Sequence, residues 1–149
     1  MIQNFKIPKP TDYEKFFKNH GLKWMVDLSK KKVFLNDNRV NENPHLPELK
    51  DLYFLYQLIV LNNRTTVLEY GCGWSTLIMH LALLKNEKRF KKKVYTRCGN
   101  PYELICVDNS KKFLNISKNR VMKYSNKFRK VKFIYSEARM TKFNNRYCT

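Results

Sequence analysis

The stretch that decides the fold is Val67-Leu68-Glu69-Tyr70-Gly71-Cys72-Gly73-Trp74-Ser75. Residues 65–70, which overlap the start of this stretch, are mostly β-branched or apolar, and this composition predicts a strand. Two glycines at alternate positions then allow a tight turn and a ligand lying against bare backbone. The residues from 76 to about 85 are apolar on nearly every side, which predicts a helix buried against a sheet. Ser75 is expected to cap this helix.

Further elements are predicted on both sides of this stretch. Upstream, the spacing of apolar residues predicts helices near 12–19 and over 47–61. The triplet 33–35 between them has the composition of a short strand. Downstream, the pattern predicts a strand at 103–108, a helix at about 110–124, a strand at 131–136 and a loop over 137–149.

The order strand, glycine loop, helix, strand, helix, strand is a β-α-β-α-β unit, which predicts parallel pairing with right-handed crossovers. The fold class is therefore α/β, a Rossmann-like half with three parallel strands and flanking helices. We assign residues 1–63 to an N-terminal helical cap and residues 64–149 to a partial Rossmann-like cofactor-binding domain.

Acidic residues stand on both sides of the glycine loop. Glu69 precedes the first glycine by two positions, where its carboxylate would repel the pyrophosphate of a dinucleotide. The dinucleotide pattern also needs a glycine at position 76, which is Thr76 here. Glu69 instead suits a cofactor with an ammonium group and a sulfonium centre. Asp108, at the end of the second strand, can bond the two hydroxyls of a ribose.

The segment 66–138 resembles class I S-adenosylmethionine-dependent methyltransferases. Their first motif is an acid followed by glycines at alternate positions, although Ser75 stands where many members have a third glycine. The resemblance implies that Asp108 holds the ribose and that the loop 136–138 contacts the adenine. The residues expected to bind the cofactor are Glu69, Tyr70, Gly71, Cys72, Gly73, Ser75, Asp108, Asn109 and Glu137.

Each of these assignments has a structural alternative. Glu69 could be a strand-end carboxylate that caps a turn, and Asp108 could be only a helix N-cap. Glu137 could be an ordinary exposed acid. Tyr70 and Trp74 could be core aromatics. These alternatives stay open at the level of the sequence.

The resemblance implies methyl transfer, and because the charge is diffuse we favour a small molecule or sugar as the substrate. An RNA or DNA methyltransferase and a non-catalytic module that binds a nucleoside or an anion are the rival functions, and a nicotinamide-dependent oxidoreductase is the least favoured. We name no catalytic residue, because in this family the loop after a fourth strand supplies such groups. A complete domain of this class has about seven strands, so we expect this chain to be part of a longer protein.

The net charge of +18 permits a nucleic-acid or other anionic partner, but the lysines are spread along the whole chain and we favour compositional drift as their explanation. Gly71 and Asp108 lie 37 positions apart, against about 20 in a compact unit. We attribute the excess to a basic surface excursion over 85–101.

Other classes of protein and site are disfavoured. The chain has no run of about 18 apolar residues and no apolar signal core, so we expect neither a membrane span nor secretion. The four cysteines lack C-x-x-C spacing and no histidine lies at metal-ligand spacing from them, so we expect reduced cysteines, no metal site and a cytoplasmic location. His80 lies within an apolar helix and is expected to be a core residue.

Overall fold

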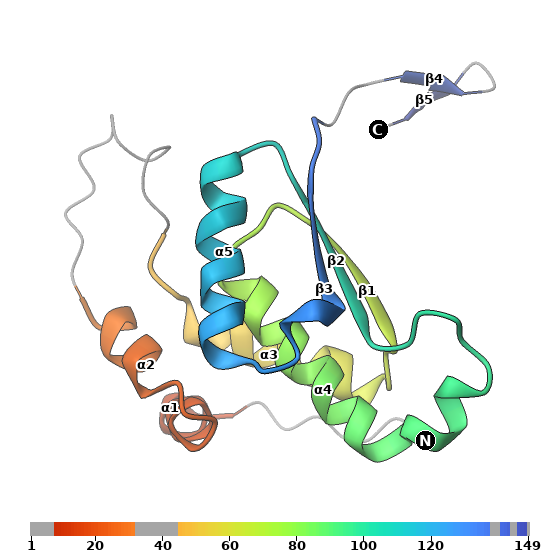
Figure 1. Cartoon of the computed structure of the whole chain (residues 1–149). Coiled ribbons are helices and arrows are strands. Elements are labelled where there is room, and N and C mark those ends of the chain that lie inside the picture. Colours follow the sequence, from red (N-terminus) through yellow and green to blue (C-terminus); the bar gives the residue numbers. More distant parts are fainter. Residues whose placement is uncertain (1–7, 32–44, 138–140, 144–145, 149) are drawn as a thin grey trace.

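The computed structural model describes residues 8–31, 45–137, 141–143 and 146–148 (Figure 1). It has α/β architecture, with a parallel sheet in the order β1-β2-β3 and a separate two-stranded antiparallel hairpin. The elements in chain order are α1 (Pro10–Asn19), α2 (Lys23–Ser29), α3 (Leu49–Leu61), β1 (Thr66–Tyr70), α4 (Trp74–Tyr95), β2 (Glu103–Asp108), α5 (Lys111–Tyr124), the 3-10 turn η2 (Phe128–Lys130), β3 (Val131–Tyr135), β4 (Thr141–Phe143) and β5 (Arg146–Cys148).

The predicted β-α-β-α-β unit is confirmed by the strand pairing. Parallel β1 and β2 are joined by α4, and parallel β2 and β3 are joined by α5. The register sets Glu69 opposite Cys106 and Asp108 opposite Tyr135. The carboxyl ends of all three strands therefore meet at one edge of the sheet, beside the glycine loop.

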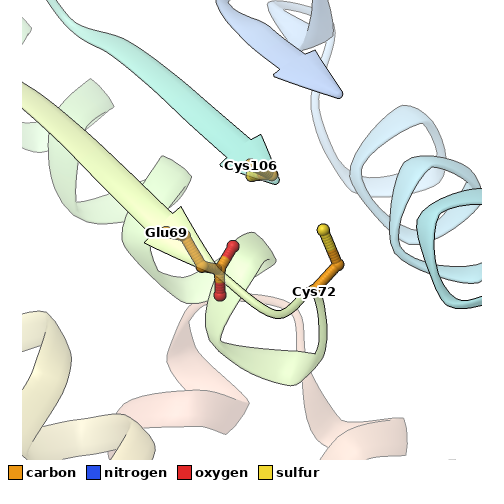
Figure 2. A group of neighbouring side chains, drawn as sticks. All are labelled: Glu69, Cys72 and Cys106. Carbon is orange, nitrogen blue, oxygen red and sulfur yellow. The ribbon is translucent and has the colours of Figure 1, made fainter. Parts of the chain in front are cut away.

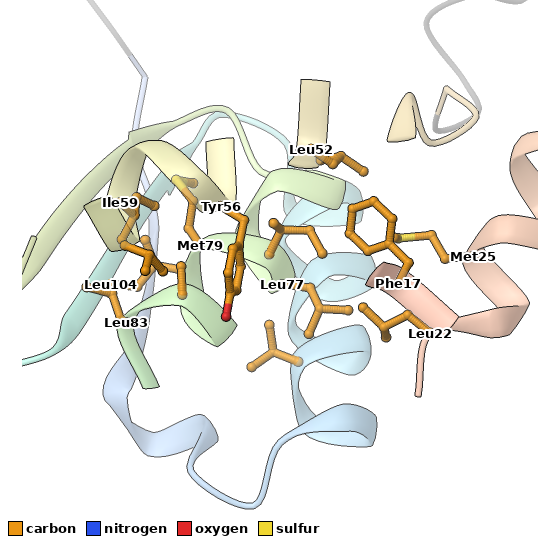
Figure 3. Packing of buried hydrophobic residues seen from close by; sticks show 14 of the residues in the cluster. Phe17, Leu22, Met25, Leu52, Tyr56, Ile59, Leu77, Met79, Leu83 and Leu104 are labelled. Atoms are coloured by element: carbon orange, nitrogen blue, oxygen red, sulfur yellow. The ribbon is translucent and has the colours of Figure 1, made fainter. Parts of the chain in front are cut away.

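A single hydrophobic core holds the molecule together. α4 packs between the sheet and α3, and α1 and α2 add side chains to the same cluster (Figure 3). Leu77 and Leu83 of α4 are fully buried, and such burial stabilises the fold by about 1.5–3 kcal/mol for each side chain. The core thus joins the predicted helical cap, through residues such as Phe17 and Tyr56, to the α/β unit.

The described helices all lie on one side of the parallel sheet, so they leave its other face uncovered (Figure 1). Side chains alternate between the two faces of a strand, and parallel sheets are normally covered on both. Leu68, Tyr70 and Ile134 are exposed on the open face, at 53%, 76% and 44%. This face is an apolar surface of the described chain.

The structure corrects the predicted extent of the helix after the glycine loop. α4 runs to Tyr95 instead of ending near Lys85, so the basic surface stretch over 85–101 is mostly helix rather than loop. Lysine, arginine and glutamate are good helix formers, and the lysines and arginines of this stretch point mostly into solvent. Its positive charge therefore lies at the end of α4 remote from the glycine loop.

Two further predictions are wrong, and a third falls outside the described residues. Gly73 occupies the N-cap of α4 and Ser75 lies inside the first turn, so the predicted Ser75 cap is wrong. Residues 137–149 were expected to be loop, but they contain the β4-β5 hairpin. The strand suggested at 33–35 lies outside the described residues.

Candidate functional site

The glycine loop between β1 and α4 is held by its own backbone amides. Gly71 has a φ of +84°, a conformation that favours glycine. Its N–H donates to the Val107 carbonyl at 2.8 Å, and the next amide, of Cys72, donates to Asp108 Oδ2 at 2.6 Å. The amide of Gly73 donates to Thr76 Oγ1 at 3.1 Å. All three amides of the loop are thus bonded to protein acceptors.

Glu69 faces the first turn of α4. Its side chain is buried, and its two oxygens accept hydrogen bonds from Ser75 Oγ at 2.5 Å and Thr76 Oγ1 at 2.7 Å. Burial raises the pKa of Glu69, and the two hydroxyl hydrogen bonds oppose that rise. The bonds from Gly73 to Thr76 and from Thr76 to Glu69 form a chain in which each strengthens the next.

Asp108 ties the loop to the sheet and to α5. One carboxylate oxygen accepts from the Cys72 amide, and the other accepts from the Ser110 amide at 2.7 Å. The Asp108 carbonyl accepts from the Ser136 amide at 3.1 Å, which fixes the loop after β3. Ser110 and not Asp108 is the N-cap of α5, since the Ser110 hydroxyl accepts from Phe113 N at 3.3 Å.

The other residues predicted to contact the cofactor are either half-buried in the glycine loop or exposed near the ends of the strands. Cys72 and Gly73 are half-buried in the loop, and the Gly73 carbonyl accepts from Ser117 of α5 at 3.4 Å. Tyr70 points to the open face of the sheet, so it is not a core aromatic. Asn109 and Glu137 are exposed at the carboxyl edge of the sheet. The expected adenine contact at residue 138 lies outside the described residues.

A stacked cation beside the loop could not be predicted from the sequence. The Arg120 guanidinium lies 3.5 Å from the centre of the Trp74 ring, although the two residues are far apart in the chain. Burial lowers the pKa of Arg120 to about 10. Trp74 Nε1 donates to the His45 carbonyl at 2.7 Å, and its ring lies 5.5 Å from that of Trp24. Trp74 therefore packs the start of α4 against α5 and α2.

The fold also places the thiols of Cys72 and Cys106 close together, although their spacing in the sequence did not predict this. Glu69, Cys72 and Cys106 each offer a ligand atom, and these atoms all lie within 4.8 Å of one another (Figure 2). Cys72 and Cys106 are free thiols. They come together only because β1 and β2 pair in a register that sets Glu69 beside Cys106.

His80 is confirmed as a core residue. Its side chain is fully buried in α4, and Nε2 is 2.7 Å from the Ser125 hydroxyl. Burial, reinforced by the nearby positive charge of Lys130, lowers the pKa of His80 to about 4. The imidazole is therefore neutral at physiological pH.

None of the described helices has both the length and the apolar character needed to cross a membrane. Comparison with models of known protein families, with curated proteins and with solved structures finds no match.

Proposed function

We propose that this chain binds S-adenosylmethionine at the glycine loop and serves methyl transfer to a small molecule or sugar. The observation that carries the proposal is the charge and bonding of the loop between parallel β1 and α4. Two carboxylates, Glu69 and Asp108, adjoin it, and its three amides are all bonded within the protein. A cationic cofactor suits such a site better than an anionic one.

The bonding of the loop argues against a dinucleotide. A pyrophosphate at a glycine loop is held by free backbone N–H groups. Here the amides of Gly71, Cys72 and Gly73 already have acceptors, and Glu69 and Asp108 would repel the phosphates. A sulfonium and an ammonium group meet neither obstacle.

Asp108 is the best candidate for the ribose. An ionised carboxylate has about four acceptor positions, and the two backbone amides at Asp108 use one on each oxygen. The remaining positions can accept the two ribose hydroxyls. The same side chain would then hold both the cofactor and the loop beneath it.

Glu69 has a more indirect role in this proposal. Glu69 and Asp108 are both nearly buried, but both oxygens of Glu69 already accept hydroxyl hydrogen bonds from the first turn of α4. Glu69 therefore acts as a positioning residue, holding the first turn of α4 against β1 and supplying negative charge behind the loop. The protein's contribution to catalysis would be to hold the acceptor nucleophile in line with the methyl group, since positioning can lower such barriers by several kcal/mol.

A nucleic-acid substrate is the second candidate, and the basic half of α4 is the feature that favours it. Its exposed cations are Lys85, Lys88, Arg89, Lys91, Lys92, Lys93 and, just beyond the helix, Arg97. A helix rises about 1.5 Å per residue, so the first of these lies roughly 16 Å from the helix start. The charge is thus well separated from the glycine loop, and we favour the smaller substrate.

Calorimetry with the whole chain tests the proposal. We expect S-adenosylhomocysteine to bind and NAD to give no heat of binding. Tight binding of NAD without binding of S-adenosylhomocysteine would overturn the assignment. For the second candidate, binding to a short RNA or DNA should fall steeply with salt, and a flat response would remove it. A cytoplasmic location, as the free thiols suggest, belongs to the same proposal.

A further inference from the structure

Three metal-ligating groups converge beneath the glycine loop from three different segments. Glu69 ends β1, Cys106 is its register partner in β2, and Cys72 lies in the loop itself. Figure 2 shows Glu69 and Cys106 near the ends of the neighbouring strands β1 and β2, and the Cys72 sulfur directed from the loop toward the strand ends. Their ligand atoms lie within 4.8 Å of one another.

These distances are close to those of a tetrahedral zinc site. Zinc binds sulfur at about 2.3 Å and carboxylate oxygen at about 2.0–2.2 Å, which sets neighbouring ligand atoms roughly 3.5–3.8 Å apart. The group needs to contract by about 1 Å, within reach of side-chain rotation. Two thiolates with one carboxylate select a borderline-soft ion such as zinc over magnesium or calcium.

The surroundings already orient two of the ligands. Hydrogen bonds from Ser75 and Thr76 fix the Glu69 carboxylate, and the bond from the Cys72 amide to Asp108 fixes the backbone that carries the loop thiol. Such outer partners are typical of metal centres, where they hold the ligands in position. We propose that Glu69, Cys72 and Cys106 form a zinc-binding site with a fourth position open to water. This inference goes beyond the proposed cofactor binding and does not rest on it.

Metal binding must displace two protons. A free thiol has an ordinary pKa of about 8.5 and is therefore protonated at neutral pH. Both thiols are therefore protonated without a metal. Zn²⁺ would bind two thiols and one carboxylate, form two zinc–sulfur bonds and one zinc–oxygen bond, and release two H⁺ to the buffer.

The test uses the whole chain, stripped of metal with a chelator and titrated with Zn²⁺ and with Cd²⁺. We expect one equivalent to bind, a sulfur-to-cadmium charge-transfer band to appear, and two protons to be released for each Zn²⁺. Cys98→Ser is the matched control, because Cys98 is a half-buried free thiol outside the group. It should behave like the parent, whereas Cys72→Ser and Cys106→Ser should weaken metal binding at least about tenfold.

A cadmium band of full intensity in both Cys72→Ser and Cys106→Ser, or no band in the parent chain, would overturn the proposal. If a serine variant fails to fold, alkylation of the parent chain with and without zinc decides instead. Zinc should slow the labelling of Cys72 and leave that of Cys98 unchanged, and an unchanged rate at Cys72 would refute the site. S-adenosylhomocysteine titrated into the metal-free chain tests the cofactor separately, so the two proposals can fail independently.

Discussion

At the scale of single residues, Asp108 does most to organise the candidate site. Its two carboxylate oxygens and its carbonyl each accept a backbone amide from a different segment, those of Cys72, Ser110 and Ser136. The sequence identified Glu69 because it precedes the paired glycines, and Asp108 because it ends the second predicted strand. The sequence could not predict that Glu69 faces α4, because the hydrogen bonds of Glu69 depend on how α4 packs against the sheet.

The left-handed backbone at Gly71 should be costly to replace. Its φ of +84° is unfavourable for any residue with a Cβ, and we expect Gly71→Ala to lower the free energy of unfolding by about 1–2 kcal/mol. An added Cβ meets nothing within 4 Å at either Gly71 or Gly99. Gly99→Ala is therefore a matched control, and equal urea midpoints for the two variants would contradict the strain at Gly71.

The buried imidazole of His80 predicts a pH dependence of stability. The folded pKa of about 4 is below the ordinary value of 6.5, so the unfolded chain binds the extra proton first as pH falls. Stability is then complete above pH 6.5 and is lost toward pH 4, by up to about 3 kcal/mol. Urea unfolding of the parent and of His80→Gln checks this. A decline of the same size in both would show that His80 is not responsible.

At the scale of elements, the strands and the glycine loop follow from local patterns, because β-branched runs and paired glycines carry their own conformational preferences. The length of α4 does not follow from such a local pattern. Its second half is basic and mostly solvent-facing, but Asn86 and Glu87 are buried. Asn86 donates to the carbonyls of Ile59 and Arg64 at 3.0 and 2.9 Å. These tertiary contacts hold the helix and are invisible in the sequence.

Glu87 should be the strongest anchor of the second half of α4. It accepts from Lys130 at 2.8 Å, Lys127 at 3.0 Å and the Tyr95 hydroxyl at 2.8 Å. Burial alone would raise the pKa of Glu87, but these hydrogen bonds outweigh it and lower the pKa to about 2. We expect Glu87→Gln to cost about 1–3 kcal/mol of stability.

The control for Glu87 is the ion pair between Glu103 and Lys132, at 2.9 Å, in which the lysine is half exposed. Glu103→Gln should cost less than about 1 kcal/mol, because exposed pairs contribute little. Thermal and urea unfolding of both variants measures the difference. Equal losses would indicate that the contacts of Glu87 add nothing beyond a surface ion pair.

At the scale of the whole molecule, the described chain has one covered and one open sheet face. β1 is an edge strand of the three-stranded sheet, and Leu68 and Ile134 are exposed on the open face. An exposed apolar face next to an unpaired edge favours association between chains.

Polar substitution on the open face should therefore improve solubility at little cost in stability. We expect Leu68→Thr with Ile134→Thr to bind less apolar dye and to lower stability by less than about 1 kcal/mol. Leu104→Thr is the contrasting variant, because Leu104 is fully buried on the covered face, and it should cost several kcal/mol. Unchanged dye binding in the double variant would contradict the open face.

The most direct test of the central claim is the affinity for S-adenosylhomocysteine, measured by calorimetry on the parent chain, Asp108→Ala and Glu103→Ala. Both acids belong to β2, but only Asp108 bonds the glycine loop. We predict that Asp108→Ala weakens binding at least about tenfold, the loss of roughly 1.4 kcal/mol, while Glu103→Ala binds like the parent. Equal affinities in all three chains would contradict the account.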